Sequence, residues 1–101
     1  MLRLTQVSCF KQGLLPITQE SAILGNVSYH DYNGILIDDA ERDKIIRNLG
    51  PFNKVMILRN HGAVACGATI EEAFHYAFNL AAACKAQVLT EQLRPSVSSV
   101  N

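Results

Sequence analysis

Two short apolar blocks, separated by a polar corner, form the centre of the hydrophobic pattern of this chain. Residues 55–58 are one unbroken apolar run, residues 63–66 are the other, and an Asn-His-Gly corner at 60–62 lies between them. An unbroken run of this length is typical of a strand that is buried on both faces. Because the connection is so short, we predict at least one antiparallel pair of strands here.

A long helix is predicted to follow Gly67 and to extend to about residue 92. Thr69 and Glu72 form a T-x-x-E capping box, and Glu71 adds negative charge to the first turn, where the helix dipole favours it. One apolar face recurs at steps of three and four residues and contains Ile70, Ala73, Phe74, Ala77, Leu80, Ala81, Cys84 and Val88. Since most of these side chains are small or aliphatic, we expect the helix to lie close against a sheet.

A further strand and helix are predicted before this core. Residues 27–32 alternate apolar or aromatic side chains with polar ones, the period of a half-buried strand, and Asn33-Gly34 then supplies a turn before the apolar residues 35–37. Asp38 and Glu41 form a D-x-x-E capping box that opens a helix to about residue 49, which Gly50-Pro51 ends. The apolar stripe of that helix consists of Ile45, Ile46 and Leu49.

The N-terminal part of the chain gives weaker signals. Residues 1–12 show no clean period, so no element is predicted there, and Pro16 restricts the apolar block at 14–17 to an edge strand or an extended connector. Thr18 can cap a brief helix that Gly25 ends. The order is therefore β-α-β-α-β-β-α, which indicates an α/β layered domain over residues 13–93 with a flexible tail at 94–101.

Composition and charge exclude several classes of function. The chain has 101 residues, of which 49% are apolar and 18% charged, so we expect one globular domain. The formal net charge is zero and basic residues are scattered singly, which argues against nucleic-acid binding. The three cysteines lack CxxC spacing, which indicates a reducing compartment, and Cys66 and Cys84 are read as small buried apolar residues. Neither a signal peptide nor a membrane span is predicted, so we expect a cytoplasmic protein.

The three histidines are the only candidates for metal binding or acid–base chemistry. His61 follows a predicted buried strand and precedes a glycine, a place where α/β folds position functional residues. Catalytic zinc, however, needs three protein ligands, and no H-x-H or H-x-x-x-H is present, so a structural corner histidine is the favoured interpretation. His30 is read as a structural strand residue, and His75 as the partner of Glu71 in a solvated i,i+4 pair.

Several short motifs, taken together, resemble one known family. They are Gly13-Leu14-Leu15-Pro16-Ile17, Tyr29-His30-Asp31-Tyr32, Leu49-Gly50-Pro51, Leu58-Arg59-Asn60-His61-Gly62 and Glu71-Glu72-Ala73-Phe74-His75-Tyr76. This series resembles the adducin head domain of the class II aldolase/adducin superfamily and covers the chain from about Ser8 to Leu93. The resemblance implies a layered α/β/α domain around a central mixed, largely antiparallel sheet. It also implies that the chain matches the C-terminal half of that domain and is incomplete at its N-terminus.

The resemblance has different implications for catalysis and for binding. In aldolase members three histidines hold zinc, and only His61 matches one of them, the histidine of a His-Gly pair. One ligand of three does not make a catalytic zinc site, so we expect no catalytic residue, no bound metal and no cofactor. Adducins promote spectrin–actin association and cap actin filaments, and the neck and basic tail that carry much of that activity have no match here. The expected partners are therefore adducin-type subunits, spectrin and actin, at the inner face of the plasma membrane.

Three hypotheses follow from these observations. The first is a non-enzymatic, adducin-like cytoskeletal protein that supports spectrin–actin membrane-skeleton assembly through self-association of its head-type domain in homo- or hetero-oligomers. The second is a zinc-dependent class II aldolase-like enzyme fragment in which His61 is one ligand and another chain supplies the rest. The third is a non-functional fragment that does not fold stably alone, because its sheet edges and apolar faces are exposed.

Overall fold

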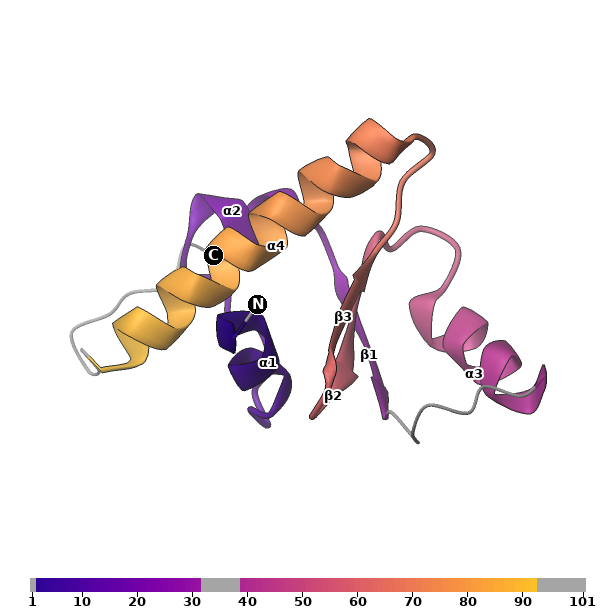
Figure 1. The fold of residues 1–101 in the computed structure, drawn as a ribbon, viewed down its shortest axis with the longest axis horizontal. Helices are drawn as coiled ribbons and strands as arrows, with labels where there is room; N and C mark the ends of the chain where they lie inside the picture. Colours follow the sequence, from indigo (N-terminus) through magenta and orange to yellow (C-terminus); the bar gives the residue numbers. More distant parts are fainter. Residues whose placement is uncertain (1, 32–38, 93–101) are drawn as a thin grey trace.

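A three-stranded sheet lies between helices on both of its sides (Figure 1). The computed structural model describes residues 2–31 and 39–92. Its elements are α1 (Leu2–Ser8), α2 (Gln19–Ile23), β1 (Val27–Asp31), α3 (Asp39–Leu49), β2 (Val55–Arg59), β3 (Gly62–Ala65) and α4 (Ile70–Glu91). Helices α1, α2 and α4 lie on one side of the sheet and α3 lies on the other (Figure 1). The α/β/α layering expected from the sequence is confirmed.

The sheet is mixed, as predicted. Strand β2 lies in the middle, pairs in parallel with β1 and pairs antiparallel with β3. The antiparallel pair is the predicted tight hairpin, in which Val55 faces Ala65 and Leu58 faces Gly62. The first four residues of β2 are all buried, which agrees with a strand that is covered on both faces. The predicted turn at Asn33-Gly34 and the apolar residues 35–37 lie outside the described residues.

The main core fills the space between the sheet and α1, α2 and α4. Its buried members are Leu4, Val7, Leu24, Val55, Ile57, Leu80, Cys84 and Val88. Burial raises the pKa of the Cys84 thiol from 9.0 to about 11, so Cys84 remains an uncharged thiol at neutral pH and packs as a small apolar residue. The predicted burial of Cys84 is therefore confirmed, whereas Cys66 is only half-buried.

Helix α4 begins where the capping motif predicts. The Thr69 hydroxyl accepts a hydrogen bond of 3.1 Å from the backbone N–H of Glu72. The Glu72 carboxylate does not close the capping box on Thr69 but accepts from the backbone N–H of Ala68 at 2.9 Å. It also lies 3.6 Å from the Lys54 ammonium, which joins the helix start to the beginning of β2.

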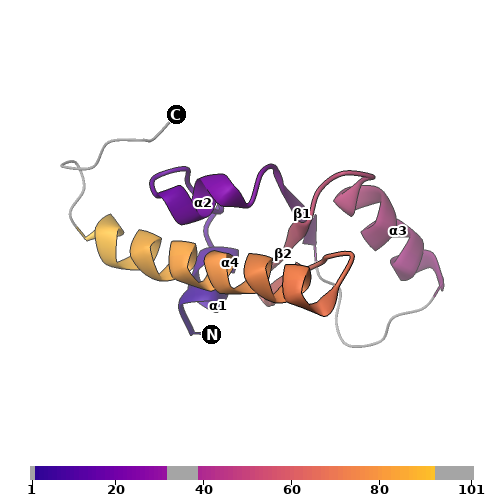
Figure 2. The same ribbon diagram turned by 90° about the horizontal axis from the view of Figure 1, so that it is seen from above.

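The predicted apolar face of α4 is only partly the buried one. Ile70 and Phe74 are 86% and 67% exposed, whereas the buried face also contains the polar residues Asn79 and Gln87. The reason is tertiary: α1 and α2 lie beside the C-terminal half of α4, and its N-terminal half extends beyond them (Figures 1 and 2). Periodicity identifies the helix correctly but does not indicate which part of it other elements cover.

The N-terminal segment contains a helix that the sequence does not predict. Residues 2–8 form α1, and residues 14–17 form no strand, so the connector is the correct one of the two predicted alternatives for that block. Gln87 of α4 holds this connector: its amide nitrogen donates to the Gly13 carbonyl at 2.9 Å and its oxygen accepts from the Leu15 N–H at 2.7 Å. The side chain of Gln87 is completely buried, and these bonds satisfy both of its polar ends.

Helix α3 ends as predicted but packs more loosely than its stripe suggests. Gly50 has φ +77°, and its N–H donates to the Ile46 carbonyl at 3.1 Å, which is the expected glycine end of a helix. Yet no residue of α3 is buried, and Ile46 is 60% exposed.

Within the ranges that the structure describes, no helix is long and apolar enough to cross a membrane.

Candidate functional site

The Asn-His-Gly corner forms the turn between β2 and β3. Asn60 has φ +62°, a left-handed conformation that asparagine tolerates better than most residues. Its N–H donates to the Ser8 carbonyl at 2.9 Å, which attaches the turn to the end of α1. The N–H of His61 donates to the Leu58 carbonyl at 3.0 Å, and its side chain is exposed. Two backbone hydrogen bonds, one to Ser8 and one to Leu58, therefore hold the turn that carries the imidazole of His61.

Arg59, just before the corner, anchors it to the N-terminal segment. One guanidinium nitrogen, Nη1, donates to the carbonyls of Phe10 and Lys11 at 2.9 and 3.3 Å. The guanidinium also lies over the Tyr29 ring, 4.4 Å from its centroid, in a cation–π contact. This role of Arg59 is not predictable from the sequence, because its hydrogen-bond partners are backbone atoms about fifty residues earlier in the chain.

A shallow hollow of about 280 Å³ lies beside this corner. It is lined by Ser8, Cys9, Phe10, Lys11, Arg59 and Asn60. Because its Nη1 donates to two carbonyls and its plane lies over an aromatic ring, Arg59 has a structural role beside this hollow. His61 does not line this hollow.

The residues present do not fit a zinc site built around His61. In residues 2–31 and 39–92, no group of three or more His, Cys, Asp or Glu side chains converges in a way that could hold a metal ion. The nearest match to the aldolase arrangement is thus a single exposed imidazole at a turn. Because a catalytic zinc needs three protein ligands and an open position, we derive no metal-dependent step for this chain.

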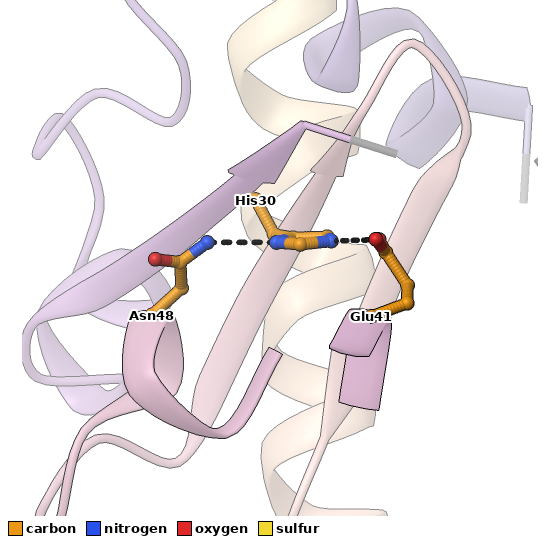
Figure 3. A network of polar contacts seen from close by, with 3 residues as sticks. All are labelled: His30, Glu41 and Asn48. Atoms are coloured by element: carbon orange, nitrogen blue, oxygen red, sulfur yellow. Dashed lines mark hydrogen bonds and ion pairs between the residues drawn. The ribbon is translucent and has the colours of Figure 1, made fainter. Parts of the chain in front are cut away.

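His30 lies at the centre of a partly buried polar network between β1 and α3 (Figure 3). Its Nδ1 accepts from the Asn48 amide at 2.7 Å, and its Nε2 lies 2.7 Å from a carboxylate oxygen of Glu41. An amide nitrogen only donates, so the proton of the neutral ring lies on Nε2 and points to Glu41. The His30 side chain is 3% exposed and that of Glu41 12%. These contacts support the structural interpretation of His30, which stays a prediction.

The capping box that the sequence predicts for Glu41 involves Asp38, which lies outside the described residues. Within the described ranges, the Glu41 carboxylate is bonded to His30, a contact that the sequence does not predict. His75, the third histidine, is exposed and forms no ion pair with Glu71 within the described part of the chain. Its Nδ1 lies 3.4 Å from the Asn79 amide, and its ring lies 5.5 Å from that of Tyr76.

We expect the His30–Glu41 pair to contribute measurably to stability. In a double-mutant cycle with His30→Leu and Glu41→Gln, followed by urea unfolding, the coupling energy should be about 1.5–3 kcal/mol, because the hydrogen bond is short, charge-assisted and shielded from water. The matched control is the exposed Asp39–Arg42 pair on the same helix, whose charged atoms are 4.0 Å apart. Its coupling should be below about 0.5 kcal/mol. Equal coupling in the two cycles would refute the network.

Comparison with known sequences finds one matching family and several similar relatives. The family described as Class II Aldolase and Adducin N-terminal domain matches residues 2–88. Alpha-adducin of Mus musculus is 57% identical over 84 residues, which are 83% of this chain and 11% of that protein. In Rattus norvegicus, gamma-adducin is 57% and beta-adducin 46% identical over 82 residues, which are 81% of this chain and 12% and 11% of those proteins. The chain thus spans about a ninth of the length of these relatives.

Two solved structures share the fold. An aldolase II superfamily protein from Pseudomonas syringae superposes with a TM-score of 0.89 at 37% identity, over 100% of this chain and 41% of that one. YgbL from Klebsiella pneumoniae, a putative aldolase/epimerase/decarboxylase, superposes with a TM-score of 0.76 at 20% identity, over 98% of this chain and 49% of that one. At that identity the second likeness concerns the fold alone.

Proposed function

Because the chain belongs to the class II aldolase and adducin family, we propose that it is a non-enzymatic, adducin-like cytoskeletal protein that associates with adducin-type subunits, including copies of itself. The observation that carries the proposal is the identity of 57%, 57% and 46% to alpha-, gamma- and beta-adducin over more than four-fifths of the chain. The aldolase II superfamily protein that shares the fold is less similar, at 37%. Similarity is thus higher toward adducins than toward that fold relative.

The proposed setting is the membrane skeleton. In this proposal the chain is cytoplasmic, lies at the inner face of the plasma membrane, and supports spectrin–actin assembly through its association with adducin-type subunits. The formal net charge of the chain is zero, so no strong overall electrostatic field favours binding to nucleic acid or anionic lipid. This is in keeping with partners that are proteins.

The rival function is a zinc-dependent aldolase-type lyase with His61 as one ligand. The exposed position of His61 in the β2–β3 turn is compatible with a ligand shared between chains. The residues around it offer no set of three ligands within the described ranges, which favours the non-enzymatic proposal. Zinc that binds at one ion per chain and is lost in His61→Ala would support the rival.

The proposal predicts direct association with a full-length adducin. Purified chain, labelled with a fluorophore at its N-terminus, should bind full-length alpha-adducin with a Kd of roughly 10 μM or tighter, measured by fluorescence anisotropy. The control partner is the aldolase II superfamily protein from Pseudomonas syringae, which has the same fold and should bind at least about tenfold more weakly. Equal binding to both proteins, or binding to neither, would contradict the proposal.

A further inference from the structure

Helix α4 presents a row of large apolar side chains to solvent. Ile70, Phe74 and Phe78 are 86%, 67% and 64% exposed and follow one another at steps of four residues along the helix. The rings of Phe74 and Phe78 lie 6.3 Å apart, in contact with one another. Such a contiguous row, in contrast to scattered single residues, is typical of a surface that another protein covers.

A hollow of about 370 Å³ continues this row toward the C-terminal half of the helix. It lies between α1 and α4 and is lined by Arg3, Leu4, Phe78, Ala81, Ala82 and Lys85. Because the side chains of Ala81 and Ala82 are small, the hollow has room for an aromatic side chain from another molecule. One end of the α4 surface therefore has large projecting side chains, and the other end has a depression.

Two of the four charged residues of α4 lie at equal distances along the helix from Phe78. Glu71 lies seven residues before Phe78 and Lys85 seven residues after it, and both are exposed. Seven residues are close to two helical turns, so these three side chains share one side of the helix. Neither charge forms an ion pair within the ranges that the structure describes.

We infer that this face of α4 binds a second copy of the chain, with the two α4 helices antiparallel and crossing at Phe78. In that arrangement Glu71 of each copy faces Lys85 of the other, so two ion pairs of opposite charge form. The same symmetry places Phe74 opposite Ala82, above the hollow, so a large side chain meets a small one. A parallel arrangement would place like charges together and large side chains against large ones, which disfavours it.

This inference names the interface through which the self-association proposed above takes place, and it rests on that proposed function. A two-fold axis requires the same patch on both copies to be complementary to itself. The α4 face meets this requirement in shape and in charge, since its N-terminal half complements its C-terminal half. An adducin-type chain bound to the same face is the alternative occupant, and the experiment below separates it from a second copy.

Sedimentation equilibrium of the full chain tests the inference. The wild-type chain should show a monomer–dimer equilibrium, and Glu71→Lys or Lys85→Glu alone should weaken it by about tenfold or more, because like charges then face each other. An equimolar mixture of the two variants should form a heterodimer within about threefold of the wild-type affinity, because the opposite charges are restored. Circular dichroism of each variant confirms that α4 remains folded.

An apolar pair of variants completes the test. Phe74→Ser should weaken dimerisation by about tenfold, whereas Phe52→Ser should leave it unchanged, because Phe52 is similarly exposed but lies in the connection between α3 and β2. A monomeric wild-type chain, or a dimer that the charge changes do not affect, overturns the inference. Binding to alpha-adducin, measured separately, distinguishes failure of this inference from failure of the proposed function. If the chain is a monomer but binds alpha-adducin, and Phe74→Ser weakens that binding, then adducin and not a second copy covers the α4 face. If the chain neither dimerises nor binds alpha-adducin, the proposed function is refuted as well.

Discussion

Gly13→Ala is expected to destabilise the fold by roughly 3–4 kcal/mol. Gly13 has φ +66°, a left-handed conformation that costs an L-residue about 1–2 kcal/mol. A Cβ atom at this position would also lie 2.2 Å from the hydroxyl oxygen of Tyr29, so the ring must move. That movement breaks the 3.0 Å hydrogen bond from the Leu14 N–H and the stacking of Arg59.

Gly25→Ala is the matched control for this substitution. Gly25 has φ +70°, nearly the same conformation, but a Cβ atom there would meet nothing within 4 Å. Gly25→Ala should therefore cost only the conformational part, about 1–2 kcal/mol. Urea unfolding followed by circular dichroism measures both variants, since the chain has no tryptophan. If the two variants lose the same stability, then Tyr29 does not pack against Gly13.

Ile57→Ala should have an effect of similar or larger size. Ile57 lies in the middle of the central strand, is 1% exposed and belongs to the core between the sheet and the helices. Truncation of a buried isoleucine removes its transfer free energy and leaves a cavity, which together cost about 2–5 kcal/mol. The expected result is a lower urea midpoint with the same slope, because the surface that unfolding exposes stays nearly the same.

Ile46→Ala provides the comparison for the core substitution. Ile46 is an isoleucine of α3 that is 60% exposed, so its removal should change the free energy of unfolding by less than about 0.5 kcal/mol. A loss near that of Ile57→Ala would mean that α3 packs far more tightly than the structure shows. A gradual, non-cooperative transition in the wild-type chain itself would favour the hypothesis that the chain needs a partner to fold.

The elements with strong local signals are those that the sequence predicts well. The apolar run at β2, the short turn and the Thr69 cap each depend on residues close together in the chain, so their patterns are readable without knowledge of the fold. Helix α1 was missed for the opposite reason. It has only seven residues, and it is stable because Leu4 and Val7 pack into a core formed by distant segments.

Polar contacts between distant segments of the chain are the features of the structure that the sequence predicts least well. Gln87 is a polar residue at a fully buried position, and nothing in its own neighbourhood reveals that the carbonyl of Gly13 and the N–H of Leu15 are its partners. The same holds for His30 and Glu41, which come together because α3 lies beside β1. His61 was located correctly at the corner, but the absence of neighbouring ligands in the described ranges is a property of the three-dimensional arrangement.

The contacts of Gln87 have a consequence for the order in which the chain acquires its structure. They connect residues 72 and 74 positions apart, so the connector after α1 gains its partners only when almost all of α4 has been synthesised. Until then, the apolar residues of the first segment remain accessible on the ribosome, where a chaperone can bind them. Contacts of such long range also slow folding, because a large loop must close before they form. We therefore expect the contacts of Gln87 with Gly13 and Leu15 to form late in folding, after α4 has formed.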